Sequence, residues 1–69
     1  MNPVALYDAL NCLSAAVLHA EAGNSGKSAT ALLEASMAAS DAFPEGSREA
    51  EVLSVILDAA ARVPAEVAP

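Results

Sequence analysis

Alanine, leucine and valine recur at intervals of three and four residues along three stretches of this 69-residue chain. That spacing is the period of an α-helix. Alanine favours a helix but buries little apolar area, so a core that relies on it is thin. A chain of this length rarely gains more than about 3–5 kcal/mol from its core without a disulfide, a metal ion or a partner. The sequence therefore predicts helices that form readily and a core that a second chain completes.

Two clusters of turn-forming residues separate the three stretches. Residues 23–26 read Gly-Asn-Ser-Gly, and residues 43–47 read Phe-Pro-Glu-Gly-Ser. Pro44 cannot donate a backbone hydrogen bond and disfavours a helical conformation of the residue before it, so a helix should end there. We predict helices over about residues 3–22, 27–42 and 47–63, followed by a flexible tail over 64–69 that Pro64 initiates.

These elements predict a single all-α domain over residues 1–69. Aromatic residues make up only 3% of the chain and no alternating pattern occurs, which argues against β structure. The expected architecture is a small three-helix bundle, or a helical hairpin with a short third helix, completed by dimerisation. In the alternative, the second and third helices fuse into one rod, and the resulting two-helix hairpin dimerises into a four-helix bundle. Pro44 favours three helices.

The apolar spacing assigns one buried face to each predicted helix. The first face contains Leu6, Leu10, Leu13, Val17 and Ala20. The second contains Ala29, Leu32, Ser36, Ala39 and Phe43. The third contains Leu53, Ile56, Leu57, Ala60 and Val63, widened by Val52. Beside the first face runs a stripe of small residues that lets another helix approach closely, namely Ala5, Ala9, Cys12 and Ala16.

The sequence contains no set of residues that predicts catalysis. Gly-Lys-Ser at residues 26–28 resembles the end of a phosphate-binding loop, but Glu21 occupies the position of that motif's first glycine and a helix precedes it. Cys12 is the single cysteine, which excludes an internal disulfide and a zinc cluster. His19 lacks a partner that would orient it as a proton carrier. We predict a protein that is not an enzyme and needs no cofactor and no metal.

The charge of the chain bears on its partners and its location. The net charge is −6, and Lys27, Arg48 and Arg62 are isolated, so direct binding to nucleic acid is not expected. A membrane-spanning helix needs about 20 nearly continuous apolar residues, and polar residues interrupt the first segment. A signal peptide needs a positively charged start, and no Lys or Arg precedes Lys27. We expect a cytoplasmic protein.

Several large apolar residues lie outside the predicted faces or on their edges, which predicts a second surface for contact with another protein. The predicted partner-binding residues are Tyr7, Leu18, Met37, Phe43 and Val55. The predicted acidic rim, which would steer the chain toward a basic surface, consists of Asp8, Glu49, Glu51 and Asp58.

These observations predict a small helical protein-interaction module that forms a homodimer and binds and modulates, by inhibition, a larger protein. The alternative is an acidic mimic of nucleic acid that occupies the basic groove of a DNA- or RNA-binding protein. In size, acidity and helical content the chain resembles small proteins that phages and mobile elements encode to inhibit host regulators or defence complexes. This resemblance concerns composition and length over the whole chain and assigns a role to no residue.

Overall fold

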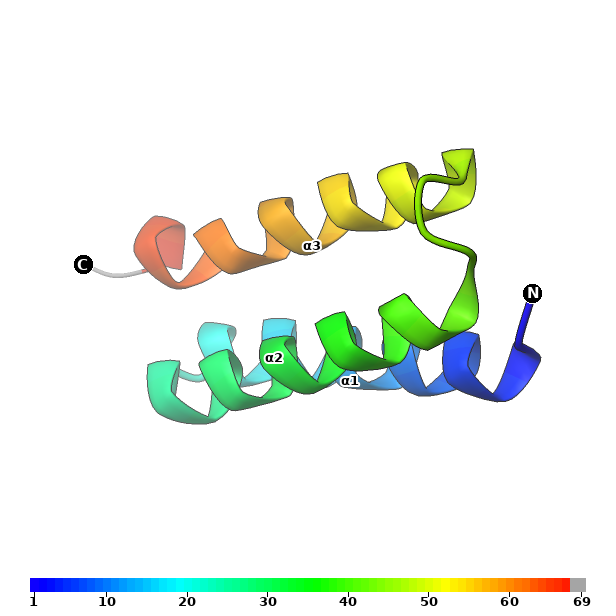
Figure 1. Cartoon of the computed structure of the whole chain (residues 1–69). Coiled ribbons are helices and arrows are strands. Elements are labelled where there is room, and N and C mark those ends of the chain that lie inside the picture. The colour runs from blue at the N-terminus through cyan, green and yellow to red at the C-terminus, as the bar shows by residue number, and fades with distance from the viewer. Residues whose placement is uncertain (68–69) are drawn as a thin grey trace.

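The computed structural model contains three α-helices joined by two tight turns (Figure 1), namely α1 (Pro3–Glu21), α2 (Ser25–Ala42) and α3 (Arg48–Val67). It describes the backbone of residues 1–67 and the side chains of residues 1–63. Helices α1 and α2 lie antiparallel in one layer, and α3 lies over both and runs antiparallel to α2 (Figure 1). The predicted all-α bundle of three helices is confirmed. The alternative in which the second and third helices fuse into one rod is wrong, because residues 43–47 leave the helical conformation.

The turn between α1 and α2 is built from local hydrogen bonds. Gly23 adopts a φ of 80°, and the backbone N–H of Asn24 donates to the carbonyl of His19 at 2.8 Å, which closes α1 with a Schellman motif. The side-chain oxygen of Asn24 then accepts from the backbone N–H of Lys27 at 3.2 Å and caps α2. Because Asn24 serves both helices, α1 ends one residue before the predicted position and α2 begins two residues earlier.

The other two helices also begin at side-chain caps. The side-chain oxygen of Asn2 accepts from the backbone N–H of Ala5 at 3.3 Å, and Pro3 occupies the first helical position, as predicted. The hydroxyl oxygen of Ser47 accepts from the backbone N–H of Ala50 at 3.2 Å at the start of α3. Each cap satisfies a backbone donor that would otherwise lack an acceptor inside the helix.

The end of α3 differs from the prediction. The helix does not stop near Val63 but continues through Pro64 to Val67, so the predicted end of the third helix is wrong. Residues 68–69 of the predicted flexible tail lie outside the described part of the chain, and the flexibility of the tail stays a prediction. Proline has a φ near that of an α-helix, but beyond the first turn it removes one backbone hydrogen bond and its ring crowds the carbonyl four residues earlier. The continuation of α3 through Pro64 therefore carries a cost, which falls near the end of the helix.

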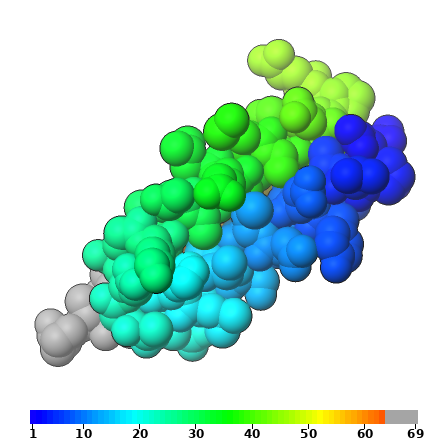
Figure 2. Space-filling view, turned by 90° about the horizontal axis from the view of Figure 1, so that it is seen from below, coloured from blue at the N-terminus to red at the C-terminus, as the bar shows by residue number. Residues whose placement is uncertain are grey.

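Helices α1 and α2 meet through alanine side chains. The buried alanines of this pair are Ala5, Ala9, Ala16 and Ala20 on α1 and Ala35, Ala39 and Ala42 on α2. The buried hydroxyl of Ser28 donates to the carbonyl of Ala16 at 2.7 Å, and the backbone N–H of Asn2 donates to the carbonyl of Ala42 at 2.8 Å. Because the distance between packed helices depends on the side chains at the contact, alanine allows the two backbones to approach closely. Figure 2 shows the two helices in contact along their length.

Helix α3 packs less closely against α1 and α2 than these two helices pack against each other. Among its residues up to Val63, Ala60 alone is buried, and Leu53 and Leu57 are half-buried. Leu6 of α1 and Phe43, which follows α2, line a hollow with Val52 and Leu53 of α3. Between helices, the hydrogen bonds of the described residues join α1 to α2, and none of them reaches α3. Apolar contact and the turn at residues 43–47 therefore hold α3 in place.

The predicted buried faces are partly wrong. Leu10, Val52 and Ile56 are exposed by 51%, 53% and 43%, and Ala29 is also exposed. The stripe of small residues on α1 occupies the centre of the fold instead of the stripe of leucines. The alanines bring α1 and α2 close together, so the large residues of these helices lie on the flanks of the contact or on the sides that face away from it.

Substitution of Ala35 by leucine should destabilise the fold. Ala35 is 0% exposed, and three further carbon atoms in a close-packed interior displace the neighbouring side chains. We expect the free energy of unfolding of Ala35→Leu to fall by about 1–3 kcal/mol, because the larger side chain separates α1 from α2. Urea denaturation followed by far-UV circular dichroism measures the change. Ala29→Leu, the same substitution at an exposed position of α2, is the control and should change stability by less than about 0.5 kcal/mol. Equal stability of the two variants would contradict the alanine contact.

Substitution by alanine should have opposite effects on stability at Gly23 and at Gly26. Gly23 has a left-handed φ of 80°, whereas Gly26 lies in the first turn of α2, and an added Cβ meets no atom within 4 Å at either position. Gly23→Ala should therefore lower the melting temperature through backbone strain of about 1 kcal/mol. Gly26→Ala should raise it, by about 0.4–1 kcal/mol of stability, because alanine restricts the unfolded chain. A higher melting temperature for Gly23→Ala would show that the Schellman turn is not formed.

Candidate interaction surfaces

The large apolar side chains of this protein lie mainly on its surface. Within the part that the structure describes, no side chain with less than 2% exposure is large, and the buried set consists of alanines and one serine. Ten large apolar residues are exposed by 43–73%, namely Met1, Val4, Tyr7, Leu10, Leu18, Leu33, Met37, Val52, Val55 and Ile56. Isolated residues of this kind are ordinary, but contiguous ones mark sites of contact with other molecules.

The first such surface lies where α1 and α3 run side by side. Leu6 and Val52 line one open hollow of about 330 Å³, together with Phe43, Arg48, Glu49 and Leu53. Leu10 follows Leu6 by one helical turn, and Ile56 follows Val52 by one turn. Helices α1 and α3 run in the same direction (Figure 1), so Leu10 and Ile56 each lie one turn farther along their helix from the shared hollow. We call Leu6, Leu10, Val52 and Ile56 the α1–α3 face.

Two further surfaces lie on single helices. Tyr7 and Leu18 are separated by eleven residues, which is about three turns, so they lie on one side of α1 and form its outer stripe. Leu33 and Met37 are one turn apart on the side of α2 opposite the buried Ala35, and we call them the α2 patch. Leu18 and Leu33 are equally exposed, at 63%.

The predicted partner-binding residues do not form one surface. Tyr7 and Leu18 lie on the outer stripe of α1, Met37 lies on the α2 patch, and Val55 is exposed on α3. Phe43 is half-buried at the end of α2 and lines two of the hollows between helices. Sequence reasoning missed the α1–α3 face because Leu10, Val52 and Ile56 were assigned to the core. The matching alanine stripes of the first two helices were the signal that could have revealed it.

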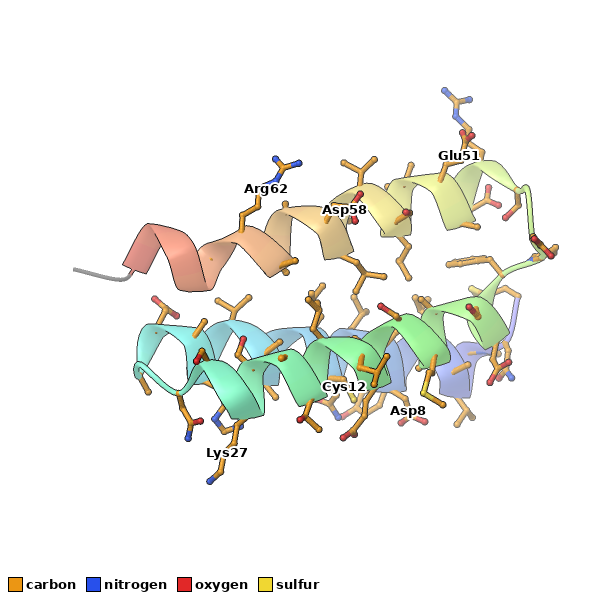
Figure 3. All side chains as sticks on the ribbon, turned by 60° about the vertical axis from the view of Figure 1, so that its left-hand side comes forward. Asp8, Cys12, Lys27, Glu51, Asp58 and Arg62 are labelled. Carbon is orange, nitrogen blue, oxygen red and sulfur yellow. The ribbon has the colours of Figure 1, made fainter. Side chains whose placement is uncertain are left out.

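The predicted acidic rim is also dispersed. Its four carboxylates are exposed, but Asp8 lies on the side of the α1–α2 pair away from α3, together with Lys27, whereas Glu51 lies on α3 and points away from the other helices (Figure 3). Glu49 lines the hollow of the α1–α3 face, and Asp58 lines a separate open hollow of about 490 Å³ between α2 and α3. The carboxylates therefore surround the molecule and do not outline one surface.

Cys12, His19 and Lys27, which the sequence analysis considered one by one, lie close together on the α1–α2 pair. Cys12, His19, Lys27 and Glu34 line a shallow hollow of about 400 Å³ in the groove between the two helices. Among the described residues, no group of three or more His, Cys, Asp and Glu side chains is placed to hold a metal ion. The Gly-Lys-Ser segment lies in the first turn of α2, and the turn at residues 22–24, not a strand, precedes this helix. None of the described helices combines the length and the apolar character that crossing a membrane requires.

Comparison of the chain with protein families, with curated proteins and with solved structures finds no match.

Proposed function

We propose that this chain is a non-enzymatic protein-interaction module that assembles with a second copy and binds and inhibits a larger protein. The observation that supports the proposal most is the distribution of side chains by size. Alanine fills the interior, while leucine, valine, methionine and tyrosine cover the exterior. Full burial of one large apolar side chain contributes about 1.5–3 kcal/mol, so several of them on one small protein supply the energy for association.

The outer stripe of α1 is the surface we assign to the larger protein. It presents Tyr7 and Leu18 about three helical turns apart on one side of α1, and tyrosine is among the residues that most often anchor protein interfaces. Both residues lie in the interior of a capped helix that the alanine contact holds against α2. A surface on such an element loses little conformational entropy on binding, because its backbone is already ordered.

The net charge of −6 supports attraction toward a basic partner. Carboxylates lie on several sides of the molecule, so the long-range field attracts a positively charged surface from most directions. Such a field raises the rate of encounter more than the final affinity. An acidic mimic of nucleic acid would need its carboxylates in a row along one surface. The positions of Asp8 and Glu51 on opposite sides of the molecule favour the apolar contact over the mimic (Figure 3).

Capture of the partner by matched variants tests the proposed contact. Tagged wild-type chain, Tyr7→Ala/Leu18→Ala and Leu33→Ala are compared in cells of the native host by quantitative mass spectrometry. We expect the double variant to lose the captured protein at least tenfold, while Leu33→Ala keeps it, since Leu33 is as exposed as Leu18 but lies on α2. Capture should also survive about 1 M salt, where the Debye length is roughly 3 Å.

The captured protein, once purified, should lose activity when the wild-type chain is added. Loss of capture at high salt, with the double variant still bound, would support the acidic mimic instead. Equal capture by all three chains at high salt would show that the larger protein does not use the outer stripe.

A further inference from the structure

We infer that the hollow between α2 and α3 is a binding site for a short, basic amphipathic helix of another protein. The hollow has a volume of about 490 Å³, and we call it the α2–α3 groove. Neither Tyr7 nor Leu18 lines it, so the groove is separate from the outer stripe of α1. This site therefore goes beyond the contact with the larger protein that we propose above.

The α2–α3 groove follows one side of each helix for about two turns. The residues that line it at helical spacing are Ser36, Ala39 and Phe43 along α2 and Ala50, Ser54 and Leu57 along α3. Each set covers seven residues of rise, which is about 10 Å. A groove of this length between two helices has room for about two to three turns of a third helix, and a helix in a groove is a recurring mode of peptide recognition.

The middle of the groove suits the apolar side of such a helix. Ala39 is buried, and Phe43, Ala50 and Leu57 are half-buried. The alanines let another helix approach closely, because the distance between packed helices depends on the side chains at the contact. The ring of Phe43 and the side chain of Leu57 offer apolar area that a ligand's leucine or valine would remove from water.

Each end of the groove carries a carboxylate. Glu45 lies in the turn that joins α2 to α3, and Asp58 lies two turns after Ala50, toward the opposite end (Figure 1). No lysine, arginine or histidine of the described residues lines the groove, and Arg62 points away from α1 and α2 (Figure 3). The two carboxylates therefore favour a ligand with a positive charge near each end.

This charge pattern distinguishes the groove from the other two hollows described above. Arg48 offsets Glu49 in the hollow of the α1–α3 face, and Lys27 offsets Glu34 in the hollow between α1 and α2. Only the α2–α3 groove of the three combines carboxylates with no basic residue. An apolar middle between two acidic ends is complementary to an amphipathic helix with lysine or arginine at both ends.

Fluorescence polarisation with the purified full-length chain and a labelled synthetic peptide tests the inference. The probe is a peptide of about four helical turns, with lysines at both ends and leucine and alanine between them. Wild type should bind this peptide. It should bind at least tenfold more weakly a peptide with glutamate in place of lysine, and likewise one with serine in place of leucine. No binding of the lysine and leucine peptide, or equal binding of the serine peptide, would overturn the inference.

Matched double variants test the role of the two carboxylates. Glu45→Gln/Asp58→Asn keeps the shape of both side chains and should weaken binding at least threefold at low ionic strength, because two exposed ion pairs are lost. Asp8→Asn/Glu34→Gln makes the same change in net charge at exposed residues outside the groove, and it should change binding less than twofold. Equal weakening by the two double variants would show that the net charge alone attracts the peptide, which overturns the site.

A bulky side chain in the groove tests the position of the peptide. Ser54 is exposed and lines the groove, whereas its exposed neighbour Val55 does not. Ser54→Trp should weaken binding at least tenfold and Val55→Trp should not, with far-UV circular dichroism verifying that both remain helical. Wild-type affinity of Ser54→Trp would overturn the site. Tyr7→Ala/Leu18→Ala should bind the peptide as wild type does, so peptide binding tests this site alone, and capture of the larger protein tests the proposed function alone.

Discussion

The close contact of α1 with α2 through alanine determines the rest of this structure. Seven alanines line it, and the hydroxyl of Ser28 bonds across it to a backbone carbonyl of α1. Alanine loses no side-chain rotamer entropy on burial, so the contact forms without the ordering cost that long side chains carry. It also brings the two backbones close together. The large apolar residues of both helices are consequently placed on its flanks, where α3 covers only some of them.

The position of α3 follows from that constraint. This helix packs on the half-buried side chains that the α1–α2 contact has displaced, and no hydrogen bond of the described residues links it to the other helices. One helix cannot cover both flanks, so Leu10 of α1 remains exposed, and Val52 and Ile56 of α3 itself are exposed as well. A partner that binds only the folded chain raises its stability by mass action. A partner of the kind that we propose would therefore raise the stability of this fold as it binds, which would join folding to the proposed function.

The sequence by itself determined the helices and most of their ends. Asn2, Ser47 and Gly23 act through hydrogen bonds to residues within five positions, so their roles can be inferred without knowledge of the fold. The sequence did not determine which stripe of α1 faces inward, because leucines and alanines recur with the same helical period and both stripes satisfy it. Only the tertiary structure decided this, since the choice depends on how closely two helices approach. In the tertiary structure Leu10 and Ile56, which were expected in the core, lie on the surface. The residues that were expected to form one binding site lie apart.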